Sequence, residues 1–454
     1  MQERFTGFRV HVETEPTARK VAKLLYRYRS AYAPRFGWLR DMYEGDHAIL
    51  HRQAKPAFKP DNRLVANYAK QIVDTMTGYF LGIPVSLVGD DDRELAELEA
   101  WGAENCADDL DAELSKTSSI YGTAYEVLWR DMDARPHSSV ATPLECFAVY
   151  GDTVERPMLW AVRFWTDSDN VVKGTVYTHS EEIPFEEVGG GIVYGEPAPH
   201  GFPGIPVIEY VGNEERTGLF EGVSSLIEAH DDALSEKAND VDYYADAYLA
   251  ITGAELDEET LKSLRDSRII NLAGMDGAPV TVQFLAKPES DATQEHLIDR
   301  LERLIFEQAM VADVSSEDFG TASGIAIRYR LQAMSNLAAT MERKFRRGLR
   351  ERWRLLLGYA GTTGVDPTAW ARITPVFTRN VPANLVEEAQ VAAQLSGIVS
   401  EQTQLSVLSC VDSPKEEAER KRDEEAERAE EITWPRGDAW QITGSEGEQE
   451  PTPA

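Results

Sequence analysis

Helical spacing of apolar residues dominates the first 120 positions of the chain. Apolar side chains recur on one face between residues 16 and 45, and again between residues 62 and 80, where Asn62 is a suitable cap. Gly82 and Pro84 end the second helix. An acidic run at residues 93–119 has the same spacing. The N-terminal region is therefore predicted to be helical.

The pattern becomes strand-like after residue 120. Short stretches rich in Val, Tyr, Phe and Trp predict strands at residues 121–130, 144–150, 159–165, 171–178 and 207–211. We expect these strands to form an antiparallel sheet with one exposed face. No phosphate-loop lysine follows the glycines at 189–191, so a tight turn is predicted there.

From Glu221 the apolar residues again have helical spacing, and nearly all charged residues of this stretch are acidic. Residues 221–246 hold eight acids and a single base, Lys237. Four of the acids lie four residues apart, opposite the apolar face: Glu228, Asp232, Glu236 and Asp240. Like charges at this spacing weaken an isolated helix. A solvated face is the ordinary explanation, but solvated faces usually mix signs, so a functional acidic surface stays open.

Residues 251–290 interrupt this helical pattern. A short helix is expected at 257–266, followed by strands at 268–273 and 279–286 that form a hairpin-like unit. Helical spacing resumes at Asp291 and continues to Ala312. The sequence thus predicts two antiparallel helices that carry a compact α/β module at one end.

A polar loop rich in Ser, Gly and Thr, residues 314–324, precedes a helix of about 34 residues that contains no proline. The first half of this helix is apolar on more than one side, which predicts burial on more than one side. The second half places basic residues opposite its apolar face: Arg343, Arg346, Arg347, Arg350 and Arg354. A mobile loop followed by a long helix that is buried on several sides indicates a loop that moves relative to a rigid frame and acts on another component.

The C-terminal region is predicted to contain a strand at 373–378 and three further helices. The first begins near Pro382 and ends at Gly397, and Ser400 can cap the second. The third, residues 414–431, has a strong start signal, with Ser413 as cap followed by Pro414 and Glu416. Residues beyond 440 are expected to be disordered.

The composition is strongly acidic, with 46 Lys and Arg against 78 Asp and Glu, a formal charge of −32. This charge favours solubility and disfavours simple phosphate binding, which needs basic side chains. The three cysteines, Cys106, Cys146 and Cys410, are too scattered for a disulfide framework or a zinc site, which fits a reducing compartment. No apolar run reaches the length of a membrane span. We expect a soluble protein of the cytosolic type.

Candidate catalytic and metal residues are few. His47 and His51 have the spacing of a helical metal pair, with Asp46 beside them, but a third ligand is missing, so an exposed polar patch is the preferred interpretation. GxxxxGK[ST], GxSxG and HExxH motifs are absent from the sequence, and we predict no catalytic, cofactor or metal site. A metal-dependent DNA-processing enzyme that uses an acidic cluster such as Asp108, Asp109 and Asp111 is one alternative. A non-channel coiled-coil scaffold is a further alternative, although the C-terminal helices do not hold heptad register.

Four segments carry a resemblance to a known family: residues 43–52, 62–85, 317–334 and 380–420. In order and spacing they resemble the portal, or head-to-tail connector, protein of tailed bacteriophages of the siphophage type. The similarity extends over roughly residues 26–429. The family implies an α+β fold, mostly helical, in which a long helix follows a tunnel loop.

By this resemblance the chain divides into the regions of a portal subunit. They are a wing at 1–220, stem helices at 221–250 and 291–313, a clip at 251–290, a tunnel loop at 314–323, a long wing helix and strand at 324–381, crown helices at 382–432 and a disordered tail at 433–454.

The same resemblance implies a non-enzymatic, cofactor-free ring, usually of twelve subunits, at one capsid vertex. Double-stranded DNA would pass through the channel during packaging and ejection without sequence-specific binding. The implied partners are the terminase large subunit as motor, a head-completion or adaptor protein, and the major capsid and scaffolding proteins, with no membrane. The implied location is the virion, with the host cytoplasm during assembly.

The resemblance also assigns candidate site residues. The tunnel-lining acids would be Glu228, Asp232, Glu236 and Asp240, because a wall of carboxylates repels phosphate and lets DNA slide. The DNA-facing loop would be Ser315, Ser316, Glu317, Asp318, Phe319, Gly320 and Thr321. The clip residues that dock motor or connector would be Asp257, Glu258, Glu259, Lys262 and Arg265. An intersubunit basic face would comprise Arg343, Arg347, Arg350 and Arg354.

Overall fold

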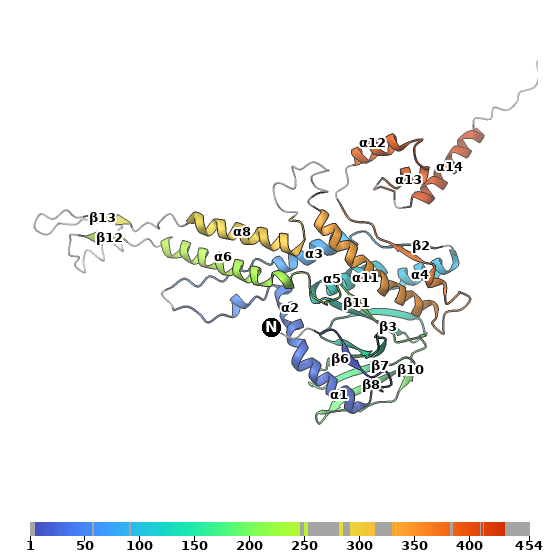
Figure 1. The fold of residues 1–454 in the computed structure, drawn as a ribbon, viewed down its shortest axis with the longest axis horizontal. Coiled ribbons are helices and arrows are strands. Elements are labelled where there is room, and N and C mark those ends of the chain that lie inside the picture. Colours follow the sequence, from blue (N-terminus) through green and yellow to red (C-terminus); the bar gives the residue numbers. More distant parts are fainter. Residues whose placement is uncertain are drawn as a thin grey trace, which may run out of the picture. The chain divides into compact units, whose positions relative to one another are not determined.

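A computed structural model describes residues 5–56, 59–89, 92–245, 249–252, 281–284, 291–313, 329, 331–381, 385–408, 410–411 and 413–431. These residues belong to two units, Met1–Asn380 and Val381–Ala454, which are described separately (Figure 1). None of the helices in the described ranges combines the length and the apolar character that a membrane crossing requires.

The first unit opens with a short strand and a series of helices whose apolar faces share one core. These elements are β1 (Phe8–Val10), α1 (Ala18–Arg27), a π-helix (Tyr28–Tyr32), α2 (Ala33–Glu44), a 3-10 helix (Ala48–His51), α3 (Tyr68–Leu81), α4 (Asp92–Asn105) and α5 (Ala107–Tyr121). Gly45, with φ 86°, ends α2 in the left-handed conformation that glycine adopts readily. The predicted helical N-terminal region is confirmed.

The predicted start of the second helix is wrong. Asn67 caps α3, because its side-chain oxygen accepts a hydrogen bond from the Lys70 backbone N–H at 2.9 Å. Asn62, the expected cap, lies in an extended segment whose backbone N–H groups donate to side chains of another helix. Those bonds, described below, hold the segment out of the helix.

Two sheets replace the single sheet that the sequence predicted. The larger has the order β1–β5–β6–β7–β8–β10, with β9 paired to β8. Its strands after β1 are β5 (Cys146–Gly151), β6 (Met158–Thr166), β7 (Val172–Tyr177), β8 (Glu181–Val188), β9 (Gly191–Tyr194) and β10 (Ala198–Pro199). The smaller has the order β11–β3–β4, formed by β11 (Val207–Val211), β3 (Thr123–Arg130) and β4 (Pro136–Ala141).

All five predicted strands are present, as β3, β5, β6, β7 and β11. The pairings are antiparallel except that β1 runs parallel to β5. Residues of both sheets, including Tyr125, Cys146 and Val207, form one buried cluster, so the small sheet covers part of the large one. Gly189 and Gly190, with φ of 60° and 81°, form the predicted tight turn between β8 and β9.

Two long helices run side by side away from this core (Figure 1). They are α6 (Ser224–Ala245) and α8 (Asp291–Ala309). The chain leaves the core along α6 and returns along α8, so the helices are antiparallel, and Gln294 near the start of α8 donates a hydrogen bond to Asp240 near the end of α6. The short ladder at their far end pairs β12 (Leu249–Thr252) with β13 (Thr281–Phe284). The sequence placed 249–250 in the helix, but they belong to β12. The described part of the predicted strand 279–286 is β13, which pairs with β12. Its predicted partner at 268–273 and the predicted short helix at 257–266 lie outside the described residues.

The long basic helix, α11 (Gln332–Leu357), packs against β11. Gly348 makes this close approach possible, because a Cβ there would lie 2.3 Å from the Tyr210 ring. Of the predicted helix of about 34 residues, 26 residues form α11 and most of the remainder lies outside the described residues. The predicted strand after it is β14 (Thr374–Val376), which pairs with β2 (Ser86–Val88).

The second unit contains the three predicted C-terminal helices, α12 (Leu385–Leu395), α13 (Glu401–Leu405) and α14 (Pro414–Glu431). Gly397 follows α12 with φ 77°. Ser400 caps α13, and Ser413 Oγ accepts the Glu416 N–H at 3.4 Å at the start of α14. The bounds of α14 agree with the prediction.

Candidate functional site

The acidic row of α6 is formed by Glu228, Asp232, Glu236 and Asp240, which repeat every fourth residue along the helix. The side chains of Asp232 and Glu236 are 41% and 59% exposed, so these carboxylates reach solvent. Asp240 accepts a hydrogen bond from Gln294 of α8 at 3.1 Å. The structure therefore places the predicted acids on one helix surface that is at least partly open.

Basic residues of the same chain meet this acidic row. Arg52 lies 2.6 Å from Asp232, and Lys55 lies 2.7 Å from Glu236. Surface ion pairs of this kind contribute about 0–1 kcal/mol each, so their main effect here is on the local charge. The acidic character of the helix is evident from its sequence, but these counter-ions are not, because they lie about 180 residues earlier in the chain.

A second, buried row on α6 binds the segment that carries Arg52 and Lys55. We call residues 47–66 the strap; 57 and 58 lie outside the described residues. The backbone N–H groups of Asn62, Leu64 and Ala66 donate to side chains of α6 at 2.6, 2.9 and 2.8 Å. The acceptors are Asn239 Oδ1, Ser235 Oγ and Asp231 Oδ1, respectively.

The spacing of both partners explains why this docking is regular. Alternate residues of an extended chain are about 6.6 Å apart, and fourth residues of a helix are about 6 Å apart. An extended segment can therefore bind one helix face every second residue without strain. In Figure 1 the strap is the blue loop beside α6, between α2 and α3.

His47 fixes the start of the strap to the same row. Its Nδ1 lies 2.5 Å from Asp231 Oδ2 and its Nε2 lies 3.0 Å from the Met42 carbonyl oxygen, and both side chains of the pair are only 1% exposed. Burial alone would lower the pKa of His47, but the hydrogen bond and charge of Asp231 outweigh it and raise the pKa.

The histidine pair is therefore not a metal site. His51 is exposed and bonds to Asp46 at 2.6 Å, whereas both ring nitrogens of His47 already have oxygen partners. The expectation of an exposed polar patch holds for His51 and is wrong for His47, because Asp231 pairs with His47 in the interior. Across the described residues, the structure contains no cluster of three His, Cys, Asp or Glu side chains that could hold a metal.

The basic face of α11 divides into paired and unpaired residues. Arg354 bonds to Glu351 on the same helix at 2.6 and 2.9 Å, and Arg346 bonds to Glu342 at 2.7 Å. Arg343, Arg347 and Arg350 make no hydrogen bond or ion pair with other described residues, and the Nε of Arg350 is buried. Three of the four predicted contact residues are thus available for a partner.

The buried centre of α11 was not predicted from the sequence. Arg352 is 2% exposed and lies 2.7 Å both from Glu126 of β3 and from Asp111 of α5. Tyr210 of β11 donates to the same Glu126 at 2.8 Å. The available signal was the position of Arg352 on the apolar face of the helix, in register with Met341, Phe345 and Leu349.

Asp111 is therefore structural, which contradicts the nuclease alternative built on Asp108, Asp109 and Asp111. Burial raises the pKa of Asp111 to about 6, although the charge of Arg352 opposes the shift. Asp108 and Asp109 are exposed in the first turn of α5. The three carboxylates do not converge, because one is buried in an ion pair and two face solvent.

Comparison with known proteins identifies relatives that match most of the chain. A family model described as phage portal protein, SPP1 Gp6-like, matches residues 23–431. The chain belongs to this phage portal family. It is 27% identical to a portal protein of Bacillus phage SPP1 over 397 residues, 82% of this chain and 78% of that protein.

Further similarities extend over comparable lengths. A portal protein of Clostridium phage phiCD119 is 22% identical over 386 residues, 79% of this chain and 84% of that one. A solved structure titled as the neck of a native GTA particle, computed with C12 symmetry, matches with a TM-score of 0.50 and 14% identity. The match covers 87% of this chain and 99% of the other, which shows that the two chains share a fold.

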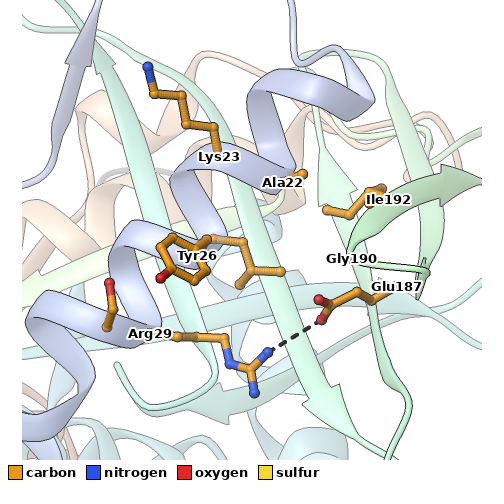
Figure 2. A pocket seen from close by; sticks show the side chains of 10 residues that line it. Ala22, Lys23, Tyr26, Arg29, Glu187, Gly190 and Ile192 are labelled. Carbon is orange, nitrogen blue, oxygen red and sulfur yellow. Dashed lines mark hydrogen bonds and ion pairs between the residues drawn. The ribbon is translucent and has the colours of Figure 1, made fainter.

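Two sets of expected portal residues cannot be placed. The DNA-facing loop residues 315–321 and the clip residues Asp257, Glu258, Glu259, Lys262 and Arg265 lie outside the described residues. A groove of about 640 Å³ lies elsewhere on this portal protein, between the N-terminal helices and the β8–β9 hairpin. Figure 2 shows Arg29 on one side of this groove, paired with Glu187 on the other at 3.4 Å.

Proposed function

We propose that this chain is the subunit of a homo-oligomeric portal ring, with twelve copies around an axial channel at one vertex of a phage capsid. Genomic double-stranded DNA passes through the channel during packaging and ejection, without sequence-specific binding. The observation that carries the proposal is the portal family match over residues 23–431. The solved neck structure of similar fold was computed with C12 symmetry, which supports the ring.

The family match supports a proposed division of the subunit into regions. The proposed wing contains α1–α5 and the two large sheets, together with the long helix α11 and the strand β14 at 324–381. The proposed stem helices are α6 and α8, and the β12–β13 ladder lies at the boundary with the proposed clip at 251–290. Residues 314–323 form the tunnel loop, and α12–α14 form the crown. The antiparallel α6–α8 pair supports this division, because it connects the body of the unit to the ladder at its far end.

In the proposed ring the acidic row of α6 lines the channel. Glu228, Asp232, Glu236 and Asp240 from every subunit repel phosphate, and repulsion in a narrow, low-dielectric tunnel is stronger than at an open surface. A wall that repels DNA lets it slide and does not hold it. Residues 315–321 then contact the moving duplex from the tunnel loop.

Contacts between subunits involve the unpaired part of the α11 basic face. Arg343, Arg347 and Arg350 make no ion pair or hydrogen bond with other described residues of their own chain, and a chain with 78 acids offers many partners on the next subunit. Arg354 contributes less, because Glu351 already binds it. Contact of this face with DNA is the minority alternative.

The portal ring itself is proposed to be non-enzymatic. ATP hydrolysis belongs to a terminase large subunit that docks on clip residues Asp257, Glu258, Glu259, Lys262 and Arg265. Head-completion or adaptor proteins replace the motor later, and major capsid and scaffolding proteins surround the ring during assembly. The protein is located in the virion after assembly in the host cytoplasm.

Electron microscopy of the purified full chain tests the proposal. We expect discrete rings with a central opening, whereas monomers at high concentration contradict it. Replacing Arg343, Arg347 and Arg350 with Gln should convert rings into monomers, and Arg354→Gln is the matched control that should leave them intact. If a chain that ends at Thr378 lost assembly completely, the coiled-coil scaffold alternative would be favoured.

A further inference from the structure

The strap neutralises half of the acidic row that the proposed channel uses. Arg52 of the strap pairs with Asp232 of the acidic row, and Lys55 of the strap pairs with Glu236. If the strap left α6, both carboxylates would lose their counter-ions. The charge of the row therefore depends on whether the strap is docked.

Docking depends on a buried contact at the first residue of the strap. His47 and Asp231 are each 1% exposed, and Asp231 uses its two oxygens for two different strap residues. Oδ2 faces His47, and Oδ1 accepts the N–H of Ala66. One carboxylate of α6 thus holds both ends of the strap.

The oxygen partners of His47 define its protonation state. A carboxylate faces Nδ1 and a backbone carbonyl faces Nε2, and neither can donate a hydrogen bond. A neutral imidazole has only one N–H, so one of its nitrogens would direct a lone pair at an oxygen. Only the imidazolium form, with both nitrogens protonated, satisfies this geometry.

The described groups that act most strongly on His47 are acidic or neutral, and none of them is a cation. The charges that raise its pKa come from Asp231 and, more weakly, Glu228, both on α6. The end of α2 contributes the Met42 carbonyl, which faces Nε2 at 3.0 Å. The neighbouring His230 packs edge-to-face against Tyr68, and burial lowers the pKa of His230, the opposite direction to the shift of His47.

The geometry points to a proton-dependent latch: protonated His47 holds the strap on α6, and loss of that proton releases the strap and exposes Asp232 and Glu236. The effect of the latch on the channel rests on the proposed function, because a change in the charge of the acidic row acts on DNA only if the row lines the channel. The docking itself is a property of the single chain.

The direction of the pH effect follows from the raised pKa of His47 relative to its ordinary value of 6.5. The free strap carries a histidine of ordinary pKa, so docking is fully stabilised by the proton below pH 6.5. This stabilisation is lost as the pH rises through the raised value. The proposed channel is thus least negative at low pH and gains two uncompensated carboxylates per subunit at high pH.

Hydrogen exchange of the full chain, followed by mass spectrometry at pH 6 and pH 9 and corrected for intrinsic rates, tests the latch. The protection of residues 61–67 should fall at least ~10-fold between the two pH values, the size expected for one hydrogen bond to a charged group. His47→Gln should remove this dependence on pH. His51→Gln is the matched control, because His51 is exposed, and should retain it.

A second variant reverses the expected behaviour. In Asp231→Asn, the amide can donate to a neutral His47 and still accept the Ala66 N–H, so residues 61–67 should be at least as protected at pH 9 as at pH 6. Equal protection of the unsubstituted chain at both pH values would overturn the latch, as would a fall in Asp231→Asn like that of the unsubstituted chain. Ring formation, imaged in the same samples, separates these results from failure of the proposed function.

Discussion

Arg352 offers the sharpest test of how the first unit is held together. Replacing it with Met keeps most of the side-chain volume but removes the cation shared by Asp111 and Glu126, which are almost fully buried. Removing one partner of a buried ion pair leaves an uncompensated charge and costs about 3–5 kcal/mol. Arg352→Met should therefore lower the free energy of unfolding by this amount at pH 8.

The cost should depend on pH in a defined direction. Burial raises the pKa of Asp111 to about 6 from its usual 3.8, so its contribution to stability is present below pH 3.8 and lost as the pH rises through 6. Without Arg352 the pKa of Asp111 rises further, because Arg352 opposes the shift. Protonation then relieves the buried charge, so the loss in Arg352→Met should be smaller at pH 5 than at pH 8.

Urea unfolding followed by tryptophan fluorescence measures both effects. The ring of Trp101 lies 5.6 Å from the Arg352 guanidinium and reports on this part of the core. Arg354→Met is the matched control: its guanidinium is partly exposed and pairs with Glu351, so the change should cost under about 1 kcal/mol at either pH. If Arg352→Met cost as little as this control, or the same at pH 5 and 8, the reasoning would be refuted.

Further predictions concern packing, thiol reactivity and the channel. Gly348→Ala should lower the free energy of unfolding by about 1–3 kcal/mol in the same urea assay, because the new Cβ meets the Tyr210 ring. Gly37→Ala, whose Cβ would have nothing within 4 Å, should stabilise α2 by about 0.5–1 kcal/mol. Equal effects of the two substitutions would contradict the packing argument. In the native protein a thiol reagent should label Cys106 and Cys410, which are exposed, but not Cys146, whose pKa is raised by burial; early labelling of Cys146 would contradict its place in the core. Replacing the acidic row, Glu228, Asp232, Glu236 and Asp240, with the corresponding amides should slow DNA translocation in a packaging assay while rings persist. The same change at Asp299 and Glu307, which are exposed on α8, should have less effect on the rate. An unchanged translocation rate in the first variant would show that the acidic row does not face DNA.

Elements defined by local patterns were predicted well. The strands β3, β5, β6, β7 and β11 have the expected places because turn residues bound short β-branched and aromatic stretches. The start of α14 follows from Ser413, Pro414 and Glu416, which act within one helical turn. In such segments the signals that decide the structure are neighbours in the sequence.

Features decided by distant partners could not be predicted in the same way. Asn62 and Asn67 are both plausible caps, and the choice between them depends on α6, which takes the N–H of Asn62 from 177 residues away. The counter-ions of the acidic row come from the strap for the same reason. The division into two sheets depends on how β3 and β11 pair, and residue types do not encode that pairing directly.

The candidate site was predictable only in part. The acidic row and the basic helix face could be identified from spacing and charge, but the split of the basic face depends on Glu351, which lies between the arginines and holds Arg354. His47 looked exposed because its partner Asp231 is a helix residue far along the chain. Arg352 was missed because its partners belong to three other elements.

The position of Arg352 also determines when the chain can finish folding during synthesis. Asp111, Glu126 and Tyr210 leave the ribosome first, and the cation that neutralises their cluster follows 142 residues after the last of them, as the difference between positions 352 and 210 shows. Until then the nascent chain has two carboxylates that cannot be buried without a proton, together with the uncovered side of β11. Chains that end before α11 should therefore be unable to close this part of the core.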